Sequence, residues 1–349
     1  MESPELSSTF FPRQTPDYIL SFQFSSWYPD FAHLSIKSTI IRPLSGEFHE
    51  YLDADGVFVP EGSEDVPAES HLSDNDDSDD DEDEPRKHYS FPELDSQIRE
   101  AIQTYGAVFP KLNFSSPRDA AWILPPSSPL KCTSPADVYL LLKSSDFVTH
   151  DLSVDNVFAG CEDGFGSTVK YSLELVLRKW YPIDRSRELR CFVRGNRLIG
   201  ITQRDTNFYE FLNELSSREK IILTTLKFWE DNIKGKSLWK DTQDYVFDFL
   251  LTRDLSRGHI IDFNPYAPRT DTLLFTFDEL HSHFEKAQGA PVFKVIDSLS
   301  HPIVTRNAPA HQHNMVPFEA LSLSNGRNIE DFANLWKESV QESTPGGSH

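Results

Sequence analysis

Three oxygen-bearing side chains near residue 250 have the types and spacing of a divalent-cation site. Asp248 lies in one apolar run, and Asp262 and Asn264 lie in the next. Alternate residues of a β-strand share a face, so Asp262 and Asn264 point the same way. If the two runs form a hairpin that turns near Leu255, Asp248 lies directly opposite Asp262.

Two carboxylates that face each other across antiparallel strands repel, so we expect a cation between Asp248 and Asp262. Mg²⁺ prefers hard oxygen ligands, typically a few carboxylates together with substrate phosphates. Asn264 adds a neutral oxygen on the same face. Spacing alone favours the alternative that these are exposed polar positions on an edge hairpin, because Asp-x-Asn is a weak signal.

Basic side chains elsewhere in the chain favour a site that also binds a phosphate. Lys111 lies inside an apolar run, where it needs an anionic partner, either a phosphate or an acidic side chain across the sheet. The polar turn at 113–119 offers backbone amides and hydroxyls to a phosphate. The apolar run at 173–177 ends in Arg178, Lys179 and Trp180. Its backbone can meet a base while Arg178 or Lys179 reaches phosphates, although Trp180 as plain core is an equal alternative.

Motifs of other chemistries are absent. The chain has no G-x-x-x-x-G-K-[ST], no G-x-G-x-x-G, no G-x-S-x-G and no H-E-x-x-H. Its three cysteines, Cys132, Cys161 and Cys191, are far apart, which is typical of a reducing compartment and disfavours a disulfide framework or a zinc ribbon. A nucleophilic hydrolase is therefore disfavoured.

Periodicity and turn residues predict the elements that position these side chains. An apparent capping box at Ser90–Glu93 and a glycine at Gly106 frame one expected helix. The remaining expected elements are strands at 38–42, 107–113 and 171–181, hairpins at 51–59, 188–205 and 244–266, and helices from 134, over 208–233 and over 329–340.

Composition indicates a globular protein with one acidic linker. The 349 residues are 38% hydrophobic and 12% aromatic, and the net charge is −22. Between Glu61 and Glu84 lie thirteen acidic residues and no Lys or Arg, so the rest of the chain is only mildly acidic. Direct nucleic-acid binding is therefore not expected. The chain also lacks a membrane-spanning apolar run and a signal-peptide pattern, so we expect a cytoplasmic protein.

The same shifts in composition predict the domain organisation. We expect a flexible N-terminus at 1–16, a first subdomain at 17–60 and 90–170, a disordered acidic linker at 61–89, a second subdomain at 171–300, and a partly disordered extension at 301–349. Ser73 and Ser78 precede acidic residues, which suits an acidophilic kinase, although unmodified serines in a solubilising loop are as consistent with the pattern.

Seven motifs in this chain resemble the cell division cycle protein 123 family of eukaryotes. The motifs are FSSWYP at 24–29, FPKLNFSSPRDAAW at 109–122, LKSSDF at 142–147, LVLRKW at 175–180, ELRCFV at 188–193, IGITQRD at 199–205 and IDFNP at 261–265. So many matches in one order make the resemblance specific. It runs from about residue 22 to residue 280, broken by the acidic linker.

The resemblance implies an α+β fold of the ATP-grasp type, in which two subdomains with mostly antiparallel sheets enclose a nucleotide. It also implies an assembly chaperone for translation initiation factor two that acts on the C-terminal region of its gamma subunit and is a monomer before it binds that partner. Carried over by position, the residues that look like the ATP contacts are Lys111, Arg178, Lys179, Trp180 and Arg190, and those that look like the magnesium ligands are Asp248, Asp262 and Asn264.

Two other hypotheses remain open at this point. An ATP-grasp ligase would share the nucleotide site and would activate a carboxylate as an acyl phosphate, whereas the chaperone needs little or no ATP turnover. An acidic scaffold without a ligand would leave Asp248 and Asp262 solvated. Sequence does not show whether a pocket for a small acid adjoins the γ-phosphate, which is what separates the first two.

Overall fold

The computed structural model describes residues 10–64, 87–125, 127–161, 170–236, 242–286 and 289–301. Within them, 10–205 and 211–295 belong to one compact unit, and 206–210 and 296–301 belong to a second. The predicted helix at 329–340 and both serines of the acidic stretch lie outside the described residues. No helix in the described ranges is both long and apolar enough to cross a membrane.

The helices are short apart from two. They are α1 (Pro16–Leu20), α2 (Phe24–Phe31), η1 (Ala32–Leu34), α3 (Gly46–Asp53), α4 (Pro92–Tyr105), α5 (Pro135–Lys143), α6 (Asp146–Leu152), α7 (Val154–Val157), η2 (Arg185–Arg187), α8 (Glu210–Asn213), α9 (Leu215–Asn232) and α10 (Phe277–Glu285).

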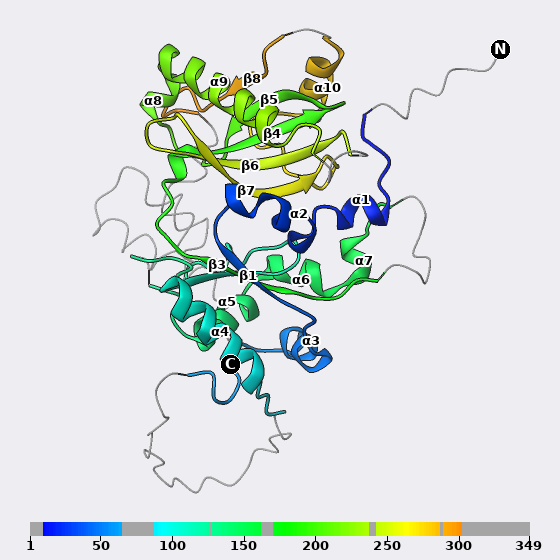
Figure 1. Ribbon diagram of the computed structural model, residues 1–349, viewed down its shortest axis with the longest axis vertical. Helices are drawn as coiled ribbons and strands as arrows, with labels where there is room; N and C mark the ends of the chain where they lie inside the picture. The colour runs from blue at the N-terminus through cyan, green and yellow to red at the C-terminus, as the bar shows by residue number, and fades with distance from the viewer. Residues whose placement is uncertain are drawn as a thin grey trace, which may run out of the picture. The chain divides into compact units, whose positions relative to one another are not determined.

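The strands form two sheets (Figure 1). A three-stranded sheet has the order β1-β3-β2, from β1 (Ser38–Ile41), β3 (Leu175–Lys179) and β2 (Val108–Lys111). A five-stranded sheet has the order β7-β6-β4-β5-β8, from β7 (Gly258–Pro265), β6 (Tyr245–Leu251), β4 (Glu188–Arg194), β5 (Arg197–Gln203) and β8 (Val292–Lys294). Among the named strands of the described ranges, only β5 and β8 pair in parallel. The predicted α+β class with mostly antiparallel sheets is therefore confirmed.

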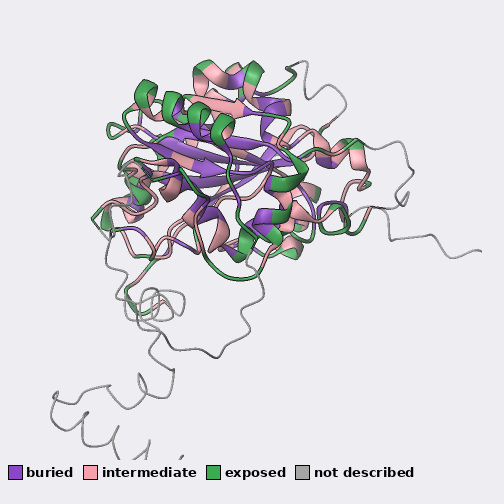
Figure 2. Ribbon diagram, turned by 90° about the horizontal axis from the view of Figure 1, so that it is seen from below, coloured by how far each residue is buried: buried purple, intermediate pink, exposed green. Residues whose placement is uncertain are grey.

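The five-stranded sheet separates an apolar face from a partly charged one. Tyr245 and Phe249 of β6 point toward α9, where the Trp229 indole donates to the Tyr245 hydroxyl at 2.8 Å and the Phe228 ring lies 4.6 Å from that of Phe249. Strand alternation turns Asp248 to the opposite face. Figure 2 shows the strands buried beneath helices with exposed outer surfaces.

The N-terminal segment packs against the edge strand β7 (Figure 1). The Trp27 ring of α2 lies 5.2 Å from the Phe263 ring, and the Ser35 hydroxyl donates to the Ile260 carbonyl at 2.7 Å. A few residues later the chain enters β1 of the other sheet. This segment therefore contacts both sheets, and the subdomain boundaries stay a prediction.

Several expected elements differ from the structure. The Ser90–Glu93 capping box is not formed: the N-cap of α4 is Phe91, which provides no side-chain cap, so Ser90 lies one residue too early. The predicted hairpin at 51–59 is wrong, since Ser45 caps α3 instead and the chain leaves it as a loop. The predicted helix over 208–233 breaks into α8 and α9.

Other expectations hold. Ser134 and Asp137 form the capping box of α5, and the β4–β5 hairpin turns at Gly195 and Asn196, both of which have positive φ.

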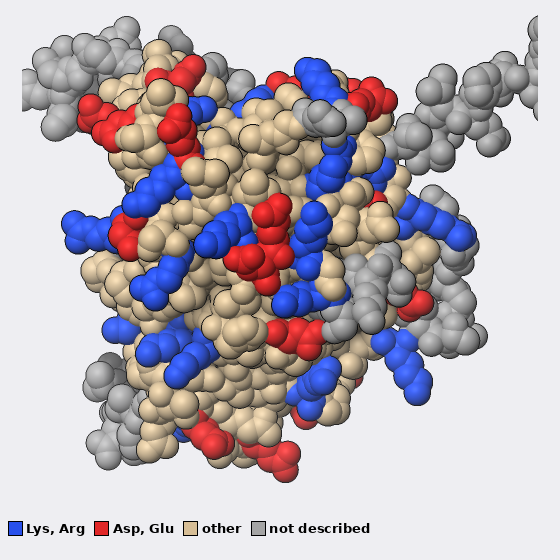
Figure 3. Space-filling model, turned by 45° about the horizontal axis from the view of Figure 1, so that its top comes forward, with Lys and Arg blue, Asp and Glu red and all other residues tan. Residues whose placement is uncertain are grey.

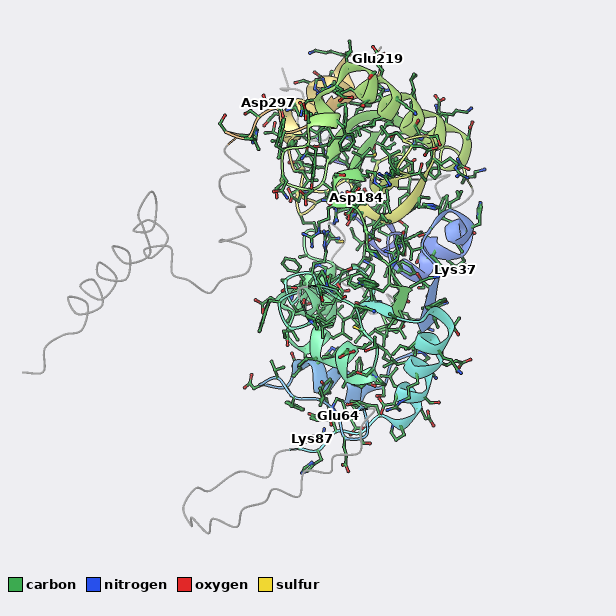
Figure 4. All side chains as sticks on the ribbon, turned by 90° about the vertical axis from the view of Figure 1, so that its left-hand side faces the viewer. Lys37, Glu64, Lys87, Asp184, Glu219 and Asp297 are labelled. Carbon is green, nitrogen blue, oxygen red and sulfur yellow. The ribbon has the colours of Figure 1, made fainter. Side chains whose placement is uncertain are left out.

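The two ends of the expected linker at 61–89 are ordered and pack into the fold. The Glu61 amide donates to the Tyr89 carbonyl at 2.9 Å. Figure 4 labels Glu64 and Lys87, which flank the stretch that the structure leaves out.

Replacing Lys143 by methionine will lower the free energy of unfolding by about 1–3 kcal/mol. Its ammonium group donates to the carbonyls of Tyr51 at 2.7 Å, Leu52 at 3.2 Å and Ala54, which are the open acceptors at the C-terminal end of α3. Urea unfolding would measure the loss. The exposed Lys37→Met is the control, and equal effects of the two variants would contradict the prediction.

Candidate functional site

The β6–β7 hairpin places two carboxylates opposite each other, as the sequence predicted. Asp248 pairs with Asp262, Val246 pairs with Asn264, and Leu255 in the turn has a φ of 56°. The ladder shifts by one residue directly after Asp248. The two acidic side chains and Asn264 therefore share one face of the sheet.

Asp248 is almost completely buried and paired with arginines. The Arg190 guanidinium donates through Nε to its Oδ1 at 2.8 Å and through Nη2 to its Oδ2 at 2.9 Å, and Arg204 Nε lies 3.2 Å from Oδ2. Burial by itself raises the pKa of Asp248, but Arg190 and Arg204 outweigh burial and lower the pKa to about 2. The carboxylate is thus charged at any physiological pH.

Asp262 receives its counter-charge from the other sheet. Lys111 of β2, only 1% exposed, donates through Nζ to Asp262 Oδ2 at 2.8 Å and also to the Phe114 carbonyl. This answers the question that the sequence left open about the anionic partner of Lys111. The Asp262 side chain is 17% exposed, compared with 2% for Asp248, so Asp262 is the more accessible of the two carboxylates.

A cavity of about 310 Å³ adjoins these carboxylates and is lined from both sheets. One part of its lining is apolar or aromatic: Ile36, Phe109, Leu130, Trp180, Pro182 and Ile183. The Trp180 indole donates to the Pro129 carbonyl at 3.1 Å, which fixes the ring at this wall. The segment that continues from Trp180 to β4, marked by Asp184 in Figure 4, forms much of this part.

The other part of the cavity carries charges of both signs. Its charged residues are Arg118, Arg178, Lys179, Arg185, Arg204, Glu188, Asp248 and Asp262, so cations outnumber anions. Arg178 is 3% exposed and donates to the Ile261 carbonyl at 2.8 Å, whereas Lys179 is exposed. Arg178 thus joins the sheets as well as lining the cavity.

Arg118 is a cation of this cavity that is free to meet a ligand. It reaches the cavity from the polar turn after β2 and, within the described ranges, pairs with no carboxylate. The neighbouring Arg204 guanidinium and burial lower the pKa of Arg118 to about 10. Arginines crowded in this way favour an anion between them. Sequence reasoning missed Arg118, Arg185 and Arg204, although two of them lie in the quoted motifs at 109–122 and 199–205.

A second cavity of about 280 Å³ is lined by Arg190 and Asn264, together with Ser115, His150 and Arg269 among others. The Arg190 guanidinium that holds Asp248 in the first cavity therefore also borders the second. The Asn264 Nδ2 atom is buried and has no hydrogen-bond partner.

The structure thus brings most of the predicted site residues together in one network. Lys111, Asp262, Asp248 and Arg190 are connected by ion pairs or strand pairing, and Arg178, Lys179 and Trp180 line the first cavity. Asn264 borders only the second cavity, and Lys111 lines neither.

The donor set fits a magnesium ion that also binds a phosphate. Asp262 and Asn264 offer hard oxygens on one face, and the unpartnered Nδ2 of Asn264 is a donor that an acceptor such as a phosphate oxygen or a water would satisfy. The described residues contain no cluster of three or more His, Cys, Asp or Glu that could hold a metal by themselves. Mg²⁺ suits such an incomplete set, because it keeps waters and shares phosphate oxygens.

Outside the cavities the charges are mixed. On the face drawn in Figure 3, Lys and Arg side chains are interspersed with Asp and Glu. This face therefore lacks the separation into basic and acidic areas that would mark a strongly charged patch.

Fold and site together define a class of protein: an α+β protein whose two mostly antiparallel sheets jointly line a cavity with an aromatic part and a charged part. A model of the D123 family matches residues 27–324. Among curated proteins, the chain is 39% identical over 335 residues to the "Translation initiation factor eIF2 assembly protein" of Schizosaccharomyces pombe, covering 94% of this chain and 98% of that one. The chain therefore belongs to the D123 family.

Two further comparisons agree. The Xenopus tropicalis protein with the same description is 38% identical over 351 residues, covering 94% of this chain and 99% of that one. The solved structure of Cdc123 from S. pombe is 38% identical, has a TM-score of 0.65, and covers 82% of this chain and 100% of that chain. The family resemblance of the seven motifs is thus confirmed.

Proposed function

We propose that this chain binds ATP with magnesium in the cavity between its sheets and, in that state, assists assembly of translation initiation factor two by binding the C-terminal region of the gamma subunit. The observation that supports the nucleotide part is the division of one cavity into an aromatic wall and a charged wall in which cations outnumber carboxylates. A base and a triphosphate require that combination.

The dimensions and polarity of the cavity support a nucleotide. Its volume of about 310 Å³ lies within the range of about 300–1,000 Å³ of small-molecule sites. Trp180 and the apolar residues beside it offer a surface for the base, while Arg118 and Arg204 offer charge-assisted hydrogen bonds to phosphates.

Asp262 and Asn264, with Asp248 beside them, would hold the magnesium ion, which would neutralise phosphate charge where Arg118 alone is insufficient. Lys111 and Arg190 would fix the two carboxylates in position. In this arrangement the residues bind and orient the nucleotide. None of them needs to exchange a proton.

The proposed role in assembly of translation initiation factor two is supported by the relatives of this chain. The S. pombe and X. tropicalis proteins are described as assembly proteins for eIF2, and both match nearly the whole chain. The gamma subunit and its C-terminal region are the finer part of the proposal. Binding ATP would favour one conformation of the two sheets, and turnover is not required for that effect.

Calorimetry with Mg-ATP tests the nucleotide site. We expect binding heat for the wild type and none for Asp262→Ala, because that variant loses a metal ligand and leaves Lys111 buried without its carboxylate. The exposed Asp30→Ala is the matched control and should behave as the wild type. No binding heat in the wild type would overturn the proposal.

A pull-down of purified gamma subunit tests the partner. Capture should survive nuclease treatment and should be lost when the C-terminal region of the subunit is deleted. A turnover assay with and without the subunit then addresses the ligase alternative. Fast ADP formation that needs a small acid and no gamma subunit would favour the ligase.

A further inference from the structure

Both oxygens of Asp248 are held by arginines. Oδ1 accepts from Arg190 Nε at 2.8 Å, and Oδ2 accepts from Arg190 Nη2 at 2.9 Å and lies 3.2 Å from Arg204 Nε. A metal ion that displaced Arg190 would leave a buried guanidinium without its partner, which is costly. Of the two opposed carboxylates, Asp262 is therefore the one that a metal ion can reach.

Asp262 is more exposed, but a cation is already bound to it. Lys111 Nζ donates to Oδ2 at 2.8 Å, and the Phe263 amide donates to Oδ1 at 3.1 Å. Because the Lys111 side chain is only 1% exposed, solvent ions screen its charge little. A divalent ion at Asp262 would share one carboxylate with this ammonium group and would be repelled by it.

The position of Lys111 is fixed by its surroundings. It is the last residue of β2, which pairs with β3, and its ammonium group also donates to the Phe114 carbonyl. That carbonyl belongs to a turn whose Phe114 and Ser115 amides both donate to Asp151 Oδ2 at 2.8 Å. The lysine is thus preorganised against Asp262 by the fold of the other sheet.

The charges around Asp262 are positive on balance. The charged lining of the first cavity comprises five cations and three carboxylates, and Lys111 and Arg190 add two more cations. The adjoining cavity adds one carboxylate, Asp271, and one further arginine, Arg269. A divalent ion by itself would enlarge this excess of positive charge, whereas a triphosphate would offset it.

We propose that Lys111 keeps a free divalent ion away from Asp262, so that the metal binds at this site only together with a triphosphate. Lys111 supplies the counter-charge of Asp262 until phosphate groups bring enough negative charge for a second cation there. It is a positioning residue that acts through Asp262, since it lines neither cavity itself. This inference rests on the proposed function, because it takes Mg-ATP as the ligand.

The test is the binding of Mn²⁺ alone, which prefers the same oxygen ligands as Mg²⁺ and whose free ion is counted by electron paramagnetic resonance. Lys111→Met should bind Mn²⁺ at least about tenfold more tightly than the wild type, because a buried cation is removed and Asp262 remains. The same variant should bind ATP in EDTA at least about threefold more weakly, because ATP is an anion. A loss of folded structure would weaken both.

Two control variants locate the effect. Lys131→Met removes a charge that lies 5.4 Å from the Trp180 ring and does not line the cavity, and it should bind Mn²⁺ as the wild type does. Lys111→Met combined with Asp262→Asn should lose the added binding. That double variant also measures the Mn²⁺ that the acidic stretch at 61–84 binds in every variant.

The wild type provides a second measurement that does not depend on the folding of Lys111→Met. ATP in EDTA should give binding heat, and Mn²⁺ alone should bind the wild type no better than Asp262→Asn. Binding of Mn²⁺ to the wild type that falls tenfold in Asp262→Asn would overturn the inference.

Failure of the inference is distinguishable from failure of the proposed function. No binding of Mg-ATP by the wild type would remove both. Binding of Mg-ATP by the wild type, with unchanged Mn²⁺ binding by Lys111→Met, would leave the proposed function standing and remove this role of Lys111. Equal gains in Lys111→Met and Lys131→Met would assign the effect to overall charge and would also overturn the inference.

Discussion

Replacing Asp248 by alanine is expected to lower the free energy of unfolding by about 3–5 kcal/mol. The variant leaves the Arg190 guanidinium, which is 7% exposed, beside Arg204 without the carboxylate that both contact. A buried charge whose partner is removed keeps its desolvation penalty and loses its compensation. Denaturant unfolding measures the change, with the exposed Asp30→Ala as the control. A loss no larger than that of the control would contradict the ion-pair network described here.

The ion pair between Arg190 and Asp248 makes the stability of the folded protein depend on pH. The pKa of Asp248 in the folded protein, about 2, lies below its ordinary value of 3.8. The carboxylate therefore stabilises the folded state fully above about pH 4, and this contribution of about 2 kcal/mol is lost as the pH falls toward 2. Asp248→Asn removes the titrating group. The difference in unfolding free energy between wild type and variant should thus shrink between pH 4 and pH 2, and a constant difference would contradict the assignment.

Replacing Arg118 by glutamine is expected to raise the Kd for Mg-ATP roughly 10- to 100-fold with little change in stability. A hydrogen bond from a charged donor contributes about 1.5–3 kcal/mol, which corresponds to that range of affinity. Arg118 pairs with no carboxylate in the described part of the chain, so its loss leaves no buried anion behind. It also relieves the crowding of Arg118 against Arg204 that lowers the pKa of Arg118.

Calorimetry with ATP and AMP would separate the two parts of the cavity. The affinity for AMP should fall less than that for ATP, because AMP lacks the phosphates that Arg118 is expected to meet. The exposed Arg253→Gln removes the same charge elsewhere and serves as the control. Equal losses for both nucleotides would place Arg118 at the base or the ribose instead, and no loss for either would remove it from the site.

The arrangement of Asp248, Asp262 and Asn264 within the hairpin followed from the sequence because it is local. Strand alternation puts Asp262 and Asn264 on one face, and a tight turn at Leu255 sets Asp248 opposite Asp262, so a few residues of chain determine the arrangement. The helix that begins after Ser134 was predictable for the same reason, since its cap lies within four residues.

Local signals also misled where packing outweighed them. The Asp55-Gly56 pair suggested a hairpin, but Tyr51 and Leu52 belong to a helix whose aromatic face is buried, and burial determined the outcome. The Ser90–Glu93 pattern matched a capping box, yet the helix begins at Pro92, one residue later than the pattern required.

By itself, the sequence determined the opposition of two carboxylates across the hairpin and indicated the family. Only the tertiary structure decided which cations lie beside the two carboxylates. Lys111 meets Asp262 across 151 positions of chain, and Arg190 meets Asp248 across 58. Arg118 and Arg204 converge on one cavity from different sheets. Contacts between distant segments depend on how whole sheets pack, and no short pattern of residues encodes that packing.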